Sequence, residues 1–256
     1  MECPICFENK GVFVKKWENG YESLRCGNCG LIYCNPMKAF IQGYNEAYED
    51  GGKYSGHLKI ISNTIKEKGE SALGWPYKTF LKYIRRNNIR FNTFFEVGCG
   101  IGHFIYYMNK LGFKAQGCDI SVSAQKAAKE LFGINILLSD FNERTVERES
   151  QEIIIAFELI EHLERPMNFF RIVESKLRKN GLFFLSTPNS DTGYPLTWNI
   201  PGAIPPFHLC IFNKQSLTQA AKLSGLEIID FIQNRFCISL NLGNIIFQNP
   251  DYCTTQ

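Results

Sequence analysis

The chain has 256 residues, enough for one large α/β domain and a small additional unit. Its 45% hydrophobic and 21% charged residues are ordinary for a soluble globular protein, and its net charge of +3 gives no electrostatic case for a nucleic-acid or membrane partner. No apolar run approaches the ~18 residues that a membrane helix needs. The first residues lack the basic and apolar regions of a signal peptide, so we expect a cytoplasmic protein with reduced thiols.

Four of the ten cysteines form a pattern at the start of the chain. Cys3 and Cys6 make one Cys-x-x-Cys pair, and Cys26 and Cys29 make a second one after nineteen intervening residues. This spacing is typical of a tetrahedral zinc site with four thiolate ligands. A redox pair or free thiols are the alternatives, but a redox pair normally lies at a strand–helix junction, and neither pair does. We predict a zinc ribbon over 1–36, with a structural role because four thiolates leave no open position.

The segments that follow the first cysteine pair predict small strands and then helices. Short strands are expected at 11–14, 21–25 and 31–33, and so small a unit needs the metal's binding energy to fold. The tract 37–92 is rich in aromatic residues, and the apolar spacing around 80–84 is helical. It predicts two or three helices that act as a linker and cap for the main domain, which we place at 93–256.

The main domain begins with a buried strand at 94–97 that runs into three glycines at alternate positions, Gly98, Gly100 and Gly102, and then into a helix. Later strands are expected at 114–120, with Asp119 at its end, at 136–141, with Asp140 at its end, and at 153–157 and 182–188. Helices are predicted from Ser121, which caps one, to about 132, over 166–179, and over 214–224; two last strands are expected at 226–232 and 244–248. Strands alternating with helices predict a mostly parallel sheet covered on both faces, with ligands beyond its carboxyl ends.

The spacing of these residues indicates which ligand binds there. A dinucleotide fingerprint needs a glycine at the position that His103 occupies. Asp119 follows Gly98 by 21 residues, where a carboxylate can accept both ribose hydroxyls. Asp140 offers an acceptor for an exocyclic amine, and Phe141 a flat apolar surface for a purine. The pattern favours an adenosine with a short zwitterionic tail and no pyrophosphate.

With these motifs the chain resembles class I S-adenosylmethionine-dependent methyltransferases over 93–230. The resemblance implies a Rossmann-like α/β sheet of order 3-2-1-4-5-7-6. It also implies that Glu96 and the three glycines hold the methionine part of S-adenosylmethionine, that Asp119 binds the ribose, and that Asp140 and Phe141 bind the adenine. The cofactor neighbours that it further implies are Cys99, Ile120 and Phe157.

Two further segments resemble motifs of a subset of this family. Glu158-Leu159-Ile160-Glu161-His162 is similar to its E-x-x-E-H segment beside the transferred methyl group. Pro205-Pro206-Phe207-His208-Leu209 is similar to its P-P-E-H-L segment, except that Phe207 stands in place of the glutamate. Together with a zinc ribbon, these segments look like methyltransferases that act on nucleotide-activated sugars or polysaccharide intermediates.

An oxygen or carbon acceptor must lose a proton, and histidine is the usual base near neutral pH. His208 lies in a long loop of the kind that forms substrate pockets, so we predict His208 as the base and His162 as the second candidate. The leading function is therefore O- or C-methylation of a small molecule. An RNA methyltransferase and a non-catalytic cofactor-binding protein are the alternatives. Residues 1–50 carry five basic against seven acidic side chains, which counts against RNA.

Overall fold

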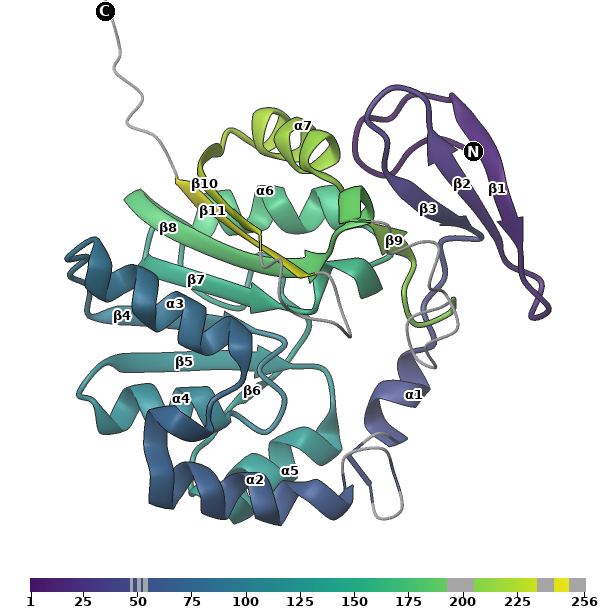
Figure 1. Ribbon diagram of the computed structural model, residues 1–256. Helices are drawn as coiled ribbons and strands as arrows, with labels where there is room; N and C mark the ends of the chain where they lie inside the picture. Colours follow the sequence, from purple (N-terminus) through teal and green to yellow (C-terminus); the bar gives the residue numbers. More distant parts are fainter. Residues whose placement is uncertain (47, 50–51, 53–54, 193–204, 234–241, 249–256) are drawn as a thin grey trace, which may run out of the picture. The chain divides into compact units, whose positions relative to one another are not determined.

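The computed structural model describes the chain apart from residues 47, 50–51, 53–54, 193–204, 234–241 and 249–256 (Figure 1). The chain groups into two units, each described here by itself. One, the ribbon unit, comprises Met1–Phe40, Phe157–Ser175 and Leu185–Gln256. The other, the glycine-loop unit, comprises Ile41–Ala156 and Lys176–Phe184. The division of the sequence into domains 1–36, 37–92 and 93–256 stays a prediction.

Each unit has its own set of elements. The glycine-loop unit holds α1 (Ile41–Glu46), α2 (Ser55–Lys68), η1 (Gly69–Ala72), α3 (Trp75–Arg86), β4 (Thr93–Val97), α4 (His103–Lys110), β5 (Lys114–Asp119), α5 (Val122–Phe132), β6 (Leu137–Leu138) and nearly all of β7 (Gln151–Phe157). The ribbon unit holds β1 (Gly11–Lys16), β2 (Glu22–Cys26), β3 (Ile32–Asn35), η2 (Ile160–His162), nearly all of α6 (Pro166–Lys176), η3 (Ser190–Thr192), β9 (Cys210–Ile211), α7 (Lys214–Ser224), β10 (Glu227–Gln233) and β11 (Leu242–Gln248). Strand β8 (Leu177–Pro188) has residues in both.

The larger sheet has the strand order β10-β11-β8-β7-β4-β5-β6. Counted from the β6 edge this is 3-2-1-4-5-7-6, so the prediction of a class I methyltransferase sheet is confirmed. Strand β4 pairs in parallel with β5 and β7, and β5 pairs in parallel with β6. The last two strands, β10 and β11, are antiparallel.

The core of the glycine-loop unit forms around β4, whose Phe94 and Phe95 are completely buried. The ring of Phe80 in α3 lies 5.8 Å from those of Phe94 and Phe104, which joins α3, β4 and α4 in one aromatic cluster. Helix α2 packs against α4 and α5 (Figure 1). The aromatic residues around 80–84, together with Trp75 and Tyr77, therefore lie in helix α3, as their spacing predicts.

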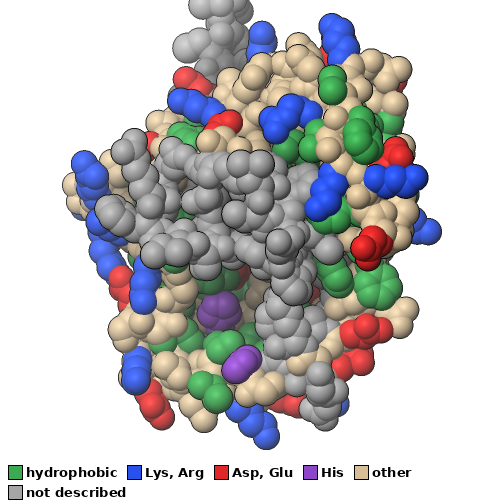
Figure 2. Space-filling model, turned by 45° about the vertical axis from the view of Figure 1, so that its right-hand side comes forward, with side chains coloured by type: hydrophobic (Ala, Val, Ile, Leu, Met, Phe, Trp, Pro, Cys, Tyr) green, Lys and Arg blue, Asp and Glu red, His purple; other side chains and the backbone are tan. Residues whose placement is uncertain are grey.

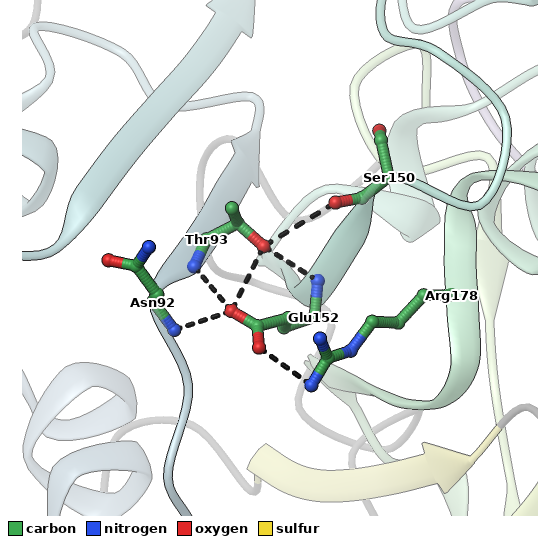
Figure 3. A network of polar contacts seen from close by, with 5 residues as sticks. All are labelled: Asn92, Thr93, Ser150, Glu152 and Arg178. Atoms are coloured by element: carbon green, nitrogen blue, oxygen red, sulfur yellow. Dashed lines mark hydrogen bonds and ion pairs between the residues drawn. The ribbon is translucent and has the colours of Figure 1, made fainter.

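At the start of β4, a carboxylate ties neighbouring strands together (Figure 3). Glu152 of β7 accepts hydrogen bonds from the backbone N–H groups of Asn92 and Thr93, the latter at 2.6 Å. Its other oxygen lies 2.6 Å from a guanidinium nitrogen of Arg178 in β8. This network lies at the end of β4 opposite the glycine loop. It therefore stabilises the sheet at a distance from the candidate site.

Two predicted boundaries are wrong. Helix α6 ends at Lys176 and not at 179, because Leu177 is completely buried in β8 and Asn180 already has a left-handed φ of 60°. The strand predicted over 136–141 is only Leu137–Leu138, and both side chains are exposed at the edge of the sheet. Across the described residues, no helix is both long and apolar enough to cross a membrane.

The smaller sheet lies within the ribbon unit and has the order β1-β2-β3-β9. Strands β1, β2 and β3 are the short strands that the sequence predicts, and they pair antiparallel. The fourth strand, β9, comes from far along the chain and pairs antiparallel with β3. Ile5, Leu31 and Tyr33 are completely buried and form the small core of the ribbon.

Candidate functional site

The glycine loop between β4 and α4 is left-handed at each of its three alternating glycines. The φ angles are 69° at Gly98, 52° at Gly100 and 68° at Gly102, a region that side chains disfavour. A Cβ on Gly102 would lie 2.7 Å from the Ile134 side chain, and one on Gly100 would lie 2.7 Å from the Tyr48 hydroxyl. Glycine is therefore required by conformation at all three positions and by space at Gly100 and Gly102, and of the three only Gly98 is exposed.

Asp119, at the end of β5, braces this loop. One carboxylate oxygen accepts a hydrogen bond of 2.8 Å from the Gly100 N–H, and the other accepts one of 2.9 Å from the Ser121 N–H. Ser121 in turn caps α5 by accepting from the Ala124 N–H, as the sequence predicts. Burial raises the pKa of Asp119, although its three backbone hydrogen bonds oppose that shift.

Glu96 lies directly before the loop and is 2% exposed. The hydroxyl of Tyr77 donates a hydrogen bond of 2.8 Å to its Oε1. Its Oε2 is buried and has no hydrogen-bond partner among the described residues. Burial raises the pKa of Glu96 to about 8, the Tyr77 bond opposes the shift, and the charge of Asp119 adds to it. A buried acceptor without a partner costs free energy unless a ligand donates to it.

The other predicted cofactor residues differ in exposure. The Asp140 side chain is exposed after the short β6, as is that of Ile120. Phe141 and Cys99 are 5% and 3% exposed, and the Phe141 ring lies 5.8 Å from that of Phe95 in the core. Phe157, which belongs to the ribbon unit, is half-buried at the end of β7.

These observations fit S-adenosylmethionine. Its methionine ammonium group can donate to Oε2 of Glu96, which has no partner among the described residues, and its polar groups can lie beside the exposed backbone of Gly98. Asp119 uses both carboxylate oxygens for the loop, but each oxygen has a second lone pair for a ribose hydroxyl.

Within the ribbon unit, the two histidines predicted as bases lie together. The ring centroids of His162 and His208 are 4.8 Å apart, with one ring edge toward the other. Nδ1 of His162 is 2.7 Å from the carbonyl oxygen of Phe207. A carbonyl oxygen only accepts, so Nδ1 carries the proton, and Nε2 of a neutral His162 has the basic lone pair.

The E-x-x-E-H segment carries two glutamates, and one of them, Glu161, lies beside His162. Glu161 is completely buried, accepts a hydrogen bond of 3.0 Å from Thr187, and places Oε1 3.9 Å from Nε2 of His162. Glu158 has a left-handed φ of 53° and accepts a hydrogen bond of 2.7 Å from Ser186. Burial raises the pKa of both carboxyls, and for Glu161 the charge of Glu158 adds to the effect. Ligand atoms of Glu161, His162 and His208 all lie within 4.8 Å of one another.

Sequence reasoning did not assign roles to Glu161, Tyr77 or Tyr48. Glu161 was visible as part of the motif, but only the fold shows that its carboxylate is completely buried beside a histidine. Tyr77 and Tyr48 lie in the aromatic tract before β4, where helical packing explains an aromatic residue equally well.

The four N-terminal cysteines converge as predicted. Their sulfur atoms all lie within 4.8 Å of one another, at 3.6 Å for Cys3–Cys29 and 3.5 Å for Cys6–Cys26. Zn–S bonds of ~2.3 Å in a tetrahedron give sulfur–sulfur distances of about 3.8 Å, so the spacing is close to that of a four-thiolate site. A disulfide would need ~2.0 Å.

Comparisons with known proteins agree with this fold. A family model described as a methyltransferase domain matches residues 74–230. The chain is 27% identical over 185 residues to the ubiquinone biosynthesis O-methyltransferase of Coxiella burnetii, covering 64% of this chain and 79% of that protein. An S-adenosylmethionine-dependent methyltransferase from Clostridium acetobutylicum has a TM-score of 0.56 at 11% identity, over 76% of this chain and 98% of that one. Magnesium protoporphyrin IX methyltransferase from Synechocystis, with bound SAH, has a TM-score of 0.51 at 15% identity, over 68% and 80% of the chains. Because the family model matches more than half of the sequence, and the sheet order and glycine loop agree with it, the chain belongs to the methyltransferase-domain family and is an S-adenosylmethionine-dependent methyltransferase of class I fold.

Proposed function

We propose that this enzyme methylates an oxygen atom of a small molecule. The observation that carries the cofactor half of the proposal is the buried Oε2 of Glu96, which has no partner among the described residues and directly precedes a left-handed glycine loop. The preference for oxygen comes from the relatives, which are named O-methyltransferases.

Each cofactor residue has a separate task. Glu96 accepts from the methionine ammonium group, and Gly98, Gly100 and Gly102 let its carboxylate end approach the backbone. Asp119 binds the ribose, and Asp140 accepts from the adenine amine. Phe141, Cys99 and Ile120 provide apolar surface around the adenosine. When bound, the cofactor supplies a methyl group that its sulfonium has already activated.

The protein's remaining tasks are to orient the acceptor, exclude water and take its proton. We assign the proton to His208, with His162 as the second candidate. His162 is held by the Phe207 carbonyl with Nδ1 protonated, so it can orient the neighbouring His208 ring or accept a proton at Nε2. A positive charge on the pair favours the ionised form of Glu161, whose Oε1 lies 3.9 Å from that Nε2, against the effect of burial. The replacement of the motif's glutamate by Phe207 does not affect this assignment, because residue 207 contacts His162 through its backbone carbonyl.

Two acceptor classes fit the proposal. The curated relatives are named for ubiquinone biosynthesis, which favours the hydroxyl of a ubiquinone-type precursor. The joint occurrence of the cysteine ribbon with the two histidine segments favours a nucleotide-activated sugar or a glycan intermediate. We rank the ubiquinone-type hydroxyl first, since it rests on sequence matches over most of the relatives' length.

We also propose that Cys3, Cys6, Cys26 and Cys29 bind one structural zinc ion. Their sulfur spacing supports this, and an ion would replace the core that so small a ribbon lacks. Metal analysis of the purified full chain tests it: about one equivalent of zinc is expected, and its complete absence from folded protein would remove the claim.

Two alternative functions, RNA methylation and cofactor binding without catalysis, can be distinguished by experiment. On the face that Figure 2 shows, Lys and Arg side chains are interspersed with Asp and Glu, a distribution unlike the basic stripe of an RNA-binding surface. A cofactor-binding protein without activity would bind S-adenosylmethionine but methylate neither acceptor class nor RNA.

The test of the function is turnover on both acceptor classes, with RNA as a third substrate. We expect an O-methylated ubiquinone-type precursor and loss of that product in His208→Ala. Methylation of RNA, or none with cofactor bound, would overturn the proposal.

A further inference from the structure

The segment that carries His208 is part of the ribbon's own sheet. Strand β9 begins two residues after His208 and pairs with β3, with Ile211 opposite Ile32 and Cys210 opposite Tyr33. The N–H of Cys34 extends this pairing by donating a hydrogen bond of 2.9 Å to the carbonyl of Leu209. The backbone on the carboxyl side of His208 is therefore bonded directly to the ribbon.

The ribbon also holds the backbone at His208 itself and before it. The side chain of Asn19, in the turn between β1 and β2, donates a hydrogen bond of 2.7 Å to the carbonyl of Pro205. The thiol of Cys34 lies 3.7 Å from the carbonyl oxygen of His208 and donates to it. Burial raises the pKa of Cys34 to about 12, so this thiol keeps its proton. Trp17, Cys34 and His208 line one small cavity.

Residues beside the second cysteine pair also contact the start of α7, the helix that follows the His208 segment. The carbonyl of Asn28, between Cys26 and Cys29, accepts a hydrogen bond of 2.7 Å from the Gln215 side chain in α7. A Cβ on Gly30 would lie 2.4 Å from Nδ2 of Asn213, the residue that caps α7. The knuckle that would hold the metal therefore packs directly against the end of the His208 segment.

We propose that the metal-bound ribbon is the positioning element for His208, and that Asn19 and Cys34 transmit the ribbon's order to that residue. The four thiolates fix the ends of β2 and β3, β3 fixes β9, and Asn19 fixes Pro205, so the backbone of 205–211 is held from both sides. Loss of the metal frees this segment while the glycine loop, which belongs to the other unit, keeps its structure. The effect on turnover rests on the proposed role of His208 as the base, but the positioning does not.

Histidine NMR on the full chain tests the positioning without any acceptor. The chain has four histidines, so selective ¹³C labelling gives a spectrum that single His→Ala variants can assign. When a chelator removes the metal, we expect the resonances of His208 and of its neighbour His162 to shift or broaden. Those of His57 and His103, both in the glycine-loop unit, should stay in place.

Asn19→Ala provides the test with the metal retained. We expect it to bind one metal ion, to shift His208 in the same direction as chelation, and to lower kcat about tenfold with an unchanged affinity for S-adenosylmethionine. The matched control is Asn9→Ala in the same ribbon, where the side chain accepts a 3.2 Å bond from the N-terminal ammonium group. It should leave both the spectrum and kcat as in the wild type.

An unmoved His208 resonance in both the metal-free protein and Asn19→Ala would overturn the proposal, as would equal effects of Asn19→Ala and Asn9→Ala on His208. If the metal-free chain does not stay folded, Asn19→Ala decides alone. A shifted resonance with unchanged kcat supports the positioning and refutes His208 as the base. The experiments can therefore refute the positioning of His208 by the ribbon and the role of His208 as the base independently of each other.

Discussion

Glu96→Gln is the variant whose effect can be worked out furthest from the structure. In the protein without cofactor, burial raises the pKa of Glu96 to about 8, against the hydrogen bond from Tyr77. At pH 7 this carboxyl is therefore about nine-tenths protonated. An ammonium group beside Oε2 would favour the ionised form and return the pKa toward its ordinary value of ~4. Binding of S-adenosylmethionine at pH 7 should then release close to one proton.

The same linkage sets the pH dependence of affinity. Because the ionised carboxyl binds the cofactor's ammonium group, the association constant should rise with pH from roughly pH 5 to 7.5 and fall again above about pH 8, where an α-amino group of pKa ~7.7–8.0 loses its proton. Glu96→Gln should abolish the rise and weaken binding at about pH 7.5 by about 10- to 100-fold, the equivalent of one charge-assisted hydrogen bond. The folded-state pKa lies above the unfolded one, so the carboxyl's contribution to stability is present below about pH 4.5 and is lost as the pH rises through 8.

Isothermal titration calorimetry in two buffers of different ionisation enthalpy measures the proton release directly. The wild type should release a proton at about pH 7, and at about pH 9, where the free cofactor's amine is mostly neutral, it should take one up instead. Tyr77→Phe is the matched control: it removes the bond that lowers the pKa of Glu96, so the pH at which release ends should move upward. Equal proton release in the wild type and in Glu96→Gln would refute the reasoning.

Three further predictions concern the other parts of the molecule. His208→Ala should keep the cofactor affinity and lose at least about 100-fold in turnover, whereas His57→Ala should lose neither; a His208→Ala variant at wild-type rate would rule that base out. Glu152→Gln should lower the free energy of unfolding at pH 7 by about 1.5–3 kcal/mol in urea titrations, because it removes a charge from the network in Figure 3. Burial raises the pKa of Glu152, but its contacts with Thr93, Asn92 and Arg178 outweigh burial and lower it. The difference in unfolding free energy between wild type and Glu152→Gln should therefore shrink as the pH falls through that pKa. A difference that stays constant with pH would contradict this. Cys29→Ser should lose the metal and lower Tm in thermal denaturation, and an unchanged metal content would remove the four-thiolate site.

The local signals of the sequence predicted much of the fold. Helix α7 was predicted and is observed at Lys214–Ser224, because Asn213 and Ser216 form a capping box at its start. The alternation of strands and helices predicted a mostly parallel sheet, whereas its strand order came from the resemblance to class I methyltransferases. The end of α6 was missed because Asn180 and Gly181 look like a helix stop, whereas the helix ends at Lys176 and both residues lie in strand β8, which begins at Leu177.

Long-range contacts were out of reach for the same reasoning. Nothing in the residues around Tyr33 indicates that Cys210, far along the chain, pairs with it, since two-residue strands have no periodicity to read. The burial of Phe141 and Glu161 likewise depends on neighbours that only the fold brings together. The candidate residues could therefore be named from the sequence, but the hydrogen bonds and pKa shifts that give them roles could not.

The central claim is methyl transfer to oxygen, and one labelling experiment tests it most directly. The metal-loaded full chain is incubated with S-adenosylmethionine that carries a trideuterated methyl group and with a hydroxylated ubiquinone-type precursor, and the product is analysed by tandem mass spectrometry. We predict one trideuteromethyl group on the precursor's oxygen, absent with His208→Ala. Label on carbon, or no label although calorimetry shows the cofactor bound, would contradict the account.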